Sequence, residues 1–157
     1  MNKIIWCLNK KGGLSLVEPS QNLAEAYIKK AEDSLESVNL NKIKEWKIAT
    51  AYYASYFSVY AILQKIGIKC EIHTCTIQFA RVFLNEFFTS EDIEFFEDSF
   101  KARGDSQYYV NKEISDEFYS IMMKRTPEFL VKCKNILSRI GEKKINEIRE
   151  RLSEYLE

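Results

Sequence analysis

The stretch Ile48-Ala-Thr-Ala-Tyr-Tyr-Ala-Ser-Tyr-Phe-Ser-Val-Tyr-Ala-Ile-Leu63 carries no charged side chain and is apolar on nearly every side of a helix. Such a helix must be covered by several neighbouring helices or by a second subunit. A membrane span is the competing interpretation. However, the stretch is shorter than the ~20 residues that a span requires, and it contains Thr50, Ser55 and Ser58. We therefore expect a buried central helix and no membrane association.

The composition around this stretch favours one globular, all-α domain. The chain has 157 residues, 46% of them hydrophobic, and only 5 Gly and 2 Pro interrupt its long periodic runs. Few breakers and helical spacing of apolar residues are typical of an antiparallel bundle of four or five helices. The 23 basic and 23 acidic side chains cancel, so a nucleic-acid site would have to come from local placement of charge.

Caps and breakers predict where the helices begin and end. The expected helices are these: about residues 21–38 after Ser20, a second ending before Gly67, a third from His73 to about Phe87, a fourth capped by Thr89 or Ser90, and a fifth from Asp116 to about Arg139 with a kink or break at Pro127. We expect carboxylates in the first turns of the fourth helix to compensate its dipole.

Three regions follow from this pattern. Residues 1–19 form an extended lead-in, in which the apolar runs Ile4–Leu8 and Leu14–Val17 flank two glycines and predict a hairpin. Residues 20–140 form the bundle. Residues 141–157 form a C-terminal amphipathic helix that either docks weakly or serves a partner.

The four cysteines, at positions 7, 70, 75 and 133, have no spacing typical of a disulfide framework. Without a secretory signal, they are interpreted as reduced thiols of a cytoplasmic protein. Cys70, His73 and Cys75 have ligand chemistry for zinc but lack a clear fourth ligand. We expect no metal and no cofactor.

The main candidate site is Lys101-Ala-Arg-Gly-Asp-Ser-Gln-Tyr-Tyr-Val110, which gathers a guanidinium, a carboxylate and two phenols at the end of an aromatic helix. Arg103 suits two-pronged binding of phosphate. The structural alternative is an ion pair with Asp105 or with a carboxylate of another helix.

Three pieces of the chain, in order over about residues 5–138, resemble the HEPN domain (higher eukaryotes and prokaryotes nucleotide-binding). Ala51-Tyr-Tyr-Ala-Ser-Tyr-Phe57 resembles the second helix of that family. Gly67-Ile-Lys-Cys-Glu-Ile-His73 resembles its glycine, loop and histidine before the third helix, and Arg103 followed by Tyr108 resembles its arginine motif. The segments Cys7-Leu8 and Glu18-Pro19-Ser20 are similar to the lead-in of some members.

The resemblance implies a homodimer with two arginine motifs facing each other in a cleft, where active members cleave RNA without a metal. It also implies a toxin–antitoxin pair in which the antitoxin is a minimal nucleotidyltransferase that, in some pairs, adenylylates a tyrosine. The chain departs from the active motif, because Gly104 follows Arg103 and Tyr108 replaces the histidine. Tyrosine, with an ordinary pKa of about 10, is a poor acid or base at neutral pH.

The remaining candidates are ranked around Arg103. Tyr108 is expected to stack on a base or donate a hydrogen bond to phosphate. Asp105 or Ser106 is expected to orient the phosphate, and Tyr109 and Lys101 are expected to support binding. One of the two tyrosines is expected to be buried, and Lys112 is a weaker candidate. His73 is expected to act only as a helix cap or in packing, away from the arginine. The tyrosines of the central helix are expected to pack in the core or in a dimer interface.

The sequence thus predicts an RNA- or nucleotide-binding protein of a toxin–antitoxin pair, with Arg103 and Tyr108 in a dimer cleft and a weak or degenerate endoribonuclease activity. The alternative is a non-catalytic dimeric module that binds a nucleotidyltransferase partner.

Overall fold

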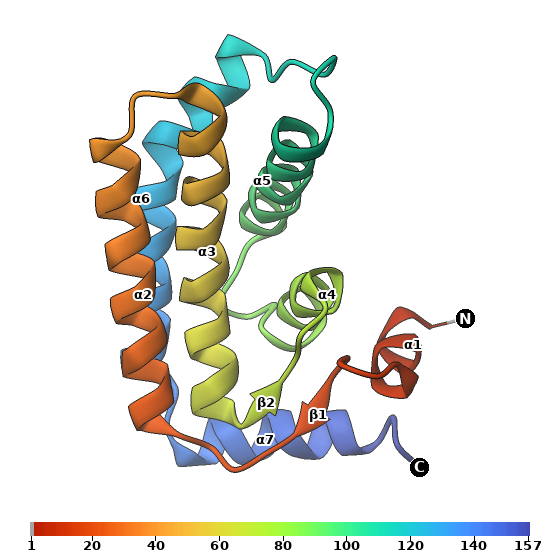
Figure 1. Cartoon of the computed structure of the whole chain (residues 1–157). Helices are drawn as coiled ribbons and strands as arrows, with labels where there is room; N and C mark the ends of the chain where they lie inside the picture. Colours follow the sequence, from red (N-terminus) through yellow and green to blue (C-terminus); the bar gives the residue numbers. More distant parts are fainter. Residues whose placement is uncertain (1) are drawn as a thin grey trace.

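The computed structural model describes residues 2–157 and shows a mostly helical protein with one small two-stranded sheet (Figure 1). Its elements in chain order are α1 (Lys3–Asn9), β1 (Ser15–Leu16), α2 (Gln21–Leu40), α3 (Lys44–Ile66), β2 (Ile68–Lys69), α4 (His73–Phe83), α5 (Ser90–Tyr108), α6 (Asp116–Arg139) and α7 (Glu142–Ser153). The expected all-α class is confirmed.

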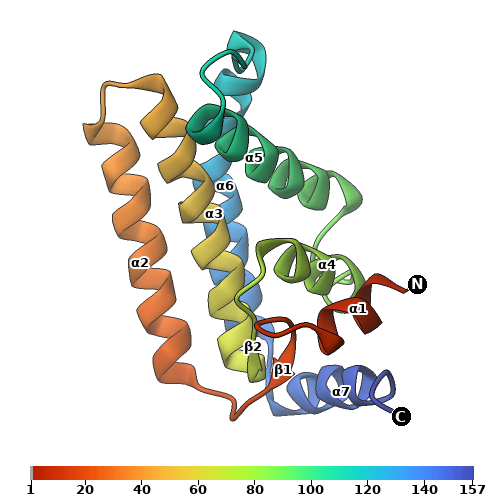
Figure 2. The same cartoon turned by 45° about the vertical axis from the view of Figure 1, so that its right-hand side comes forward.

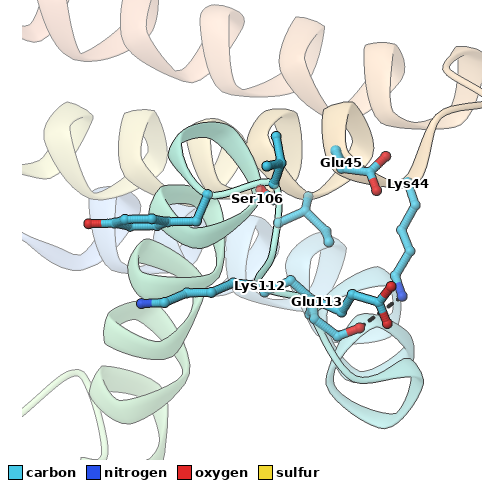
Figure 3. Close-up of a pocket in the computed structure, with 9 residues that line it drawn as sticks. Lys44, Glu45, Ser106, Lys112 and Glu113 are labelled. Carbon is cyan, nitrogen blue, oxygen red and sulfur yellow. Dashed lines mark hydrogen bonds between the residues drawn. The ribbon is translucent and has the colours of Figure 1, made fainter.

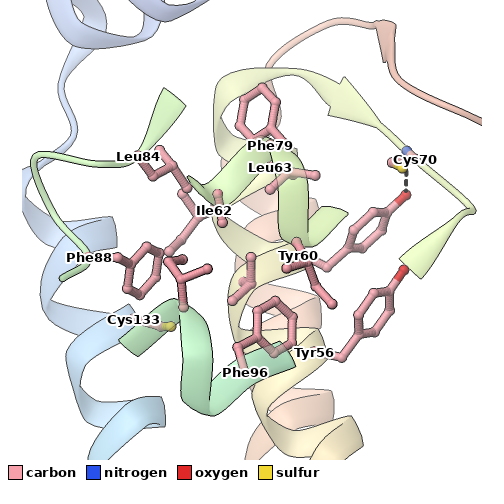
Figure 4. Packing of buried hydrophobic residues seen from close by; sticks show 14 of the residues in the cluster. Tyr56, Tyr60, Ile62, Leu63, Cys70, Phe79, Leu84, Phe88, Phe96 and Cys133 are labelled. Atoms are coloured by element: carbon pink, nitrogen blue, oxygen red, sulfur yellow. Dashed lines mark hydrogen bonds between the residues drawn. The ribbon is translucent and has the colours of Figure 1, made fainter. Parts of the chain in front are cut away.

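The central helix is α3, and it packs against α2, α5 and α6 (Figures 1 and 2). From Ile48 to Leu63 nearly all its side chains are buried, including Tyr52, which is 0% exposed. Rings and aliphatic side chains of α4, α5 and α6 close around it (Figure 4). Neighbouring helices of the chain itself therefore cover most of the charge-free stretch, which is the first of the two expected alternatives.

Local caps set most helix boundaries. Ser20 Oγ accepts a hydrogen bond from the backbone N–H of Leu23 at the start of α2, and Ser115 Oγ does the same for Phe118 at the start of α6. α6 continues through Pro127 and is not split there. α3 ends at Gly67 with a left-handed φ of 89°, a conformation that favours glycine. A Cβ at this position would also lie 2.5 Å from the Val17 carbonyl oxygen.

The predicted N-terminal hairpin is wrong. Ile4 to Leu8 lie in helix α1, where the side chain of Asn2 caps the backbone N–H of Ile4. The second apolar run does form a strand, but β1 pairs antiparallel with β2, so that Leu16 lies opposite Ile68. A run of five apolar residues fits a strand and a short helix equally well, and a long-range partner decided between them.

The C-terminal helix α7 packs closely against the fold, and the expectation of weak docking is wrong. Ile148 and Leu152 are buried, at 1% and 0% exposure. Arg149 donates hydrogen bonds from Nη1 to three backbone carbonyls, those of Val17, Ile66 and Gly67, at 2.8, 3.1 and 2.9 Å. α7 thus closes the end of the bundle where α3 meets the sheet.

A disulfide joins Cys7 of α1 to Cys75 of α4, so the expectation of four reduced thiols is wrong for this pair. Both sulfur-bearing residues are fully buried. Cys70 and Cys133 are buried free thiols. A disulfide is unusual for the expected cytoplasmic location, because thiols in that compartment are usually kept reduced.

Candidate functional site

The guanidinium of Arg103 lies among four aromatic rings near the C-terminal end of α5. Its Cζ atom is 5.2 Å from the ring centroid of Tyr52 and 5.8 Å from that of Tyr53, both on α3. It is 5.4 Å from the centroid of Phe100 and 6.0 Å from that of Tyr108, both on α5. Aromatic faces attract cations at such distances, so the rings hold the side chain without using its hydrogen-bond donors.

Within residues 2–157, Arg103 forms no ion pair. Asp105, the expected structural partner, instead lies 3.5 Å from the amino group of Lys112. Arg103 donates from Nη1 to Gln107 at 3.3 Å, while its Nε is buried and has no hydrogen-bond partner. A buried donor without an acceptor is unfavourable. An external anion would reach this side chain at its terminal nitrogens, because Nη2 is not buried and has no hydrogen-bond partner within residues 2–157.

His73 lies in the same cluster, and the expectation that it sits away from the arginine is wrong. Its Nδ1 is 2.6 Å from the Tyr52 hydroxyl, and its ring stacks on Tyr56 with centroids 4.1 Å apart. Burial, assisted by the positive charge of Arg103, lowers the pKa of His73 to about 4. His73 is therefore neutral at physiological pH.

Tyr52 and Tyr56, whose rings pack on His73, do not titrate near neutral pH either. Burial raises the pKa of Tyr52 and that of Tyr56 well above the ordinary value. Metal-free RNA cleavage calls for a group with a pKa near the working pH. The residues of this chain that surround Arg103 thus favour binding of an anion over cleavage of RNA.

Tyr108 and Tyr109 are both at the surface, 72% and 50% exposed, so the expectation that one is buried is wrong. Tyr108 lies beside the guanidinium, and its exposed ring is able to stack on a planar ligand. The amino group of Lys112 lies over the ring of Tyr109, 4.3 Å from its centroid.

The other sequence candidates have partners within the chain. The amino group of Lys101 lies 3.8 Å from the carboxylate of Glu97. Ser106 donates to the backbone carbonyl of Arg103 at 3.1 Å. Of the residues predicted to form the site with Arg103, only Tyr108 lies beside the guanidinium group itself.

Two cavities open beside the end of α5. The larger, of about 420 Å³, is lined by Lys44, Glu45, Ile48, Ser106, Tyr109, Val110, Lys112, Glu113 and Ile114 (Figure 3). The smaller, of about 270 Å³, shares Glu45 and Ser106 with it and is completed by Trp46, Gln107 and Tyr108. Two lysines and two glutamates line the larger cavity, so its charge favours neither a polyanion nor a basic partner.

Among the described residues, no group of three or more His, Cys, Asp or Glu side chains is placed to hold a metal ion. The sulfur of Cys75, one of the zinc candidates, is taken up by the disulfide. Over the same residues, no helix has the combined length and apolar character required to cross a membrane.

No protein-family model matches this chain, and no curated protein matches it in sequence. The site must therefore be interpreted from its own geometry.

Proposed function

We propose that this protein is a HEPN-type homodimer that uses Arg103 to bind the phosphate of an RNA or a nucleotide, as one member of a toxin–antitoxin pair with a minimal nucleotidyltransferase. The observation that supports it is the state of Arg103. Its guanidinium rests on four rings, pairs with no carboxylate of residues 2–157 and has a buried Nε without an acceptor. A phosphate supplies the missing negative charge, and its oxygens accept hydrogen bonds from the terminal nitrogens of the guanidinium.

The proposal favours binding with weak or no cleavage. Gly104 and Tyr108 replace the polar residue and the histidine of the active motif. Neither Tyr108 nor the neutral His73 supplies the acid and base that ribose-directed cleavage uses. A second subunit would bring another Arg103 to the cleft but no new type of acid or base.

The test measures binding of AMP and of a labelled single-stranded RNA to tag-free wild type and Arg103→Ala. The matched control is Arg139→Ala, because Arg139 also lies over a ring, 5.6 Å from the centroid of Phe87. Arg139 is the last residue of α6, whereas the C-terminal end of α5 connects to the first residue of that helix. We expect Arg103→Ala to weaken binding by roughly tenfold or more and Arg139→Ala to leave it near the wild-type value. Equal binding by wild type and Arg103→Ala, or no binding by either, contradicts the proposal.

An exposed apolar surface favours the second candidate, a non-catalytic interaction module. Large hydrophobic side chains are exposed where α2 joins α3 and where α5 ends, namely Leu40, Ile43, Trp46, Tyr108, Tyr109 and Val110. Exposed apolar groups collected at one end of a fold are typical of a protein-binding surface.

Binding of AMP and RNA separates the two candidates, while sedimentation and adenylylation test the dimer and the partner that both share. If this end mediates self-association, Trp46→Ser shifts the protein towards monomer, while Val131→Ser, at a residue of α6 that is 55% exposed, does not. Incubation with ATP and the nucleotidyltransferase, followed by peptide mass spectrometry, shows whether Tyr108 or Tyr109 is modified. Partner binding that survives Arg103→Ala, without any AMP or RNA binding, favours the interaction module.

A further inference from the structure

We infer that His73 is a second phosphate-binding residue of the Arg103 site, where its Nε2–H donates a hydrogen bond to the same phosphate group that the guanidinium binds. This inference rests on the proposed function and adds a residue from α4 that the arginine motif does not contain.

His73 and Arg103 pack on the same rings from different helices. The imidazole centroid lies 5.7 Å from that of Tyr52, 6.3 Å from that of Tyr53 and 6.0 Å from that of Phe100. Arg103 contacts the same rings at 5.2 to 5.8 Å. The positive charge of Arg103 acts on the imidazole strongly enough to lower its pKa further. The two side chains thus flank one aromatic platform.

The hydrogen bond with Tyr52 decides what His73 can do. Tyr52 is 0% exposed, and burial raises its pKa, so its hydroxyl keeps its proton. No other hydrogen-bond partner of that buried hydroxyl lies within residues 2–157, so we assign it as the donor to Nδ1, 2.6 Å away. In a neutral imidazole the ring proton then resides on Nε2. We therefore assign His73 as a neutral hydrogen-bond donor through Nε2–H. In this role it does not act as a general base.

The surroundings of His73 favour an anion. Within residues 2–157, the titratable groups whose rings pack on His73 are Tyr52, Tyr53 and Tyr56 from α3, and the positive charge of Arg103 from α5 also acts on it. His73 is also the first residue of α4. The N-cap residue of this helix, Ile72, has no side chain that can accept a hydrogen bond. Uncapped backbone N–H groups add to the positive potential there.

The test uses the fact that His73 is the only histidine of the chain. Its two ring nitrogens give isolated signals in ¹⁵N-correlated NMR spectra of tag-free protein, and their shifts report the tautomer and the pKa. The free protein should show the proton on Nε2. Addition of AMP or inorganic phosphate should move the Nε2 signal and raise the pKa of His73, because a nearby anion favours imidazolium. Adenosine, which has no phosphate, should do neither.

Variants separate His73 from Arg103. His73→Ala should weaken AMP binding roughly tenfold, as expected for the loss of a hydrogen bond to a charged group. Tyr52→Phe keeps the ring but removes the hydroxyl, so the tautomer should become mixed and AMP binding should fall. Tyr155→Phe is the matched control, because the Tyr155 ring packs on Phe83, and this variant should bind as wild type does.

The outcomes distinguish this inference from the proposed function. If Arg103→Ala loses AMP binding while wild-type His73 signals stay unmoved by AMP and His73→Ala binds normally, the inference is overturned and the proposed function stands. If AMP binds to neither wild type nor variants, both are overturned. If His73→Ala fails to fold, the response of the wild-type ring signals to AMP and phosphate decides the matter.

Discussion

The carboxylate of Asp92 on α5 forms an ion pair with the amino group of Lys132 on α6, and Arg125 lies 3.6 Å away on the other oxygen. The same carboxylate accepts the backbone N–H of Thr89 at 2.8 Å, which completes a capping box. Burial acts to raise the pKa of Asp92, but the hydrogen bonds from Lys132 and Thr89 outweigh it and hold the pKa below its usual value. One side chain therefore both caps α5 and ties it to α6.

We expect Asp92→Asn to lower the free energy of unfolding by about 3 kcal/mol, because it leaves two cations without their partner in a site where the carboxylate is nearly buried. Urea unfolding measures the difference. Asp98→Asn, an exposed carboxylate on the same helix, should change stability by less than about 0.5 kcal/mol. Equal effects of the two substitutions would show that the ion pair contributes little.

The disulfide should make stability depend on reductant. In the chain-entropy description, a crosslink between residues 68 positions apart contributes about 4 kcal/mol. Cys7→Ser should therefore lower the melting temperature, and added reductant should lower that of wild type but not that of the variant. Alkylation of unfolded protein without reductant should label Cys70 and Cys133 alone. Four labelled cysteines would contradict the crosslink.

His73 should make the protein sensitive to mild acid. Its pKa falls from 6.5 to about 4 on folding, so below pH 6.5 the unfolded state binds a proton that the native state refuses. Stability should then decrease as pH falls from 6.5 towards 4, by at most about 2 kcal/mol after allowance for the partial exposure of the ring. Asp92 and Glu97 have lowered pKa values from reference values of 3.8 and 4.5 and act mainly below that window.

Denaturant unfolding of wild type and His73→Gln at pH 7 and pH 5 measures this effect. The wild type should lose stability between the two values, and the variant should lose less. A variant with the same pH dependence as wild type would rule out His73 as the source.

Arg149→Ala should destabilise the C-terminal end of the fold by about 2 kcal/mol, since it leaves the carbonyls of Val17, Ile66 and Gly67 without a common donor. Hydrogen exchange of α7 and of the β1–β2 pair should accelerate in this variant. Lys143→Ala, at an exposed position of the same helix, should leave both unchanged. Unaltered exchange in Arg149→Ala would show that the apolar contacts alone hold α7.

The parts of the fold that could be predicted are those specified by neighbouring residues. Ser20, Thr89 and Ser115 cap their own helices, and Gly67 ends α3 by its own backbone conformation. These signals lie within a few residues of the boundary they set, so their position along the chain is sufficient.

The parts that could not be predicted depend on distant partners. The Cys7–Cys75 bond, the pairing of Leu16 with Ile68 and the approach of His73 to Arg103 each join residues from separate elements. Spacing within one helix carries no information about such contacts. For the candidate site, the sequence singled out Arg103 and Tyr108 as candidates, whereas the rings around Arg103 come together only in the packed bundle.

The two tryptophans of the chain belong to α1 and to the first turn of α3, which lie far apart in the fold (Figure 1). Trp46 is 54% exposed in the first turn of α3 and lines a cavity with Tyr108, while Trp6 is 37% exposed on α1, next to Cys7. Two proteins with a single indole each, made by Trp6→Phe or Trp46→Phe, would therefore give separate fluorescence signals. Emission from Trp46 would respond to a ligand at the arginine end, and emission from Trp6 to opening of the crosslink.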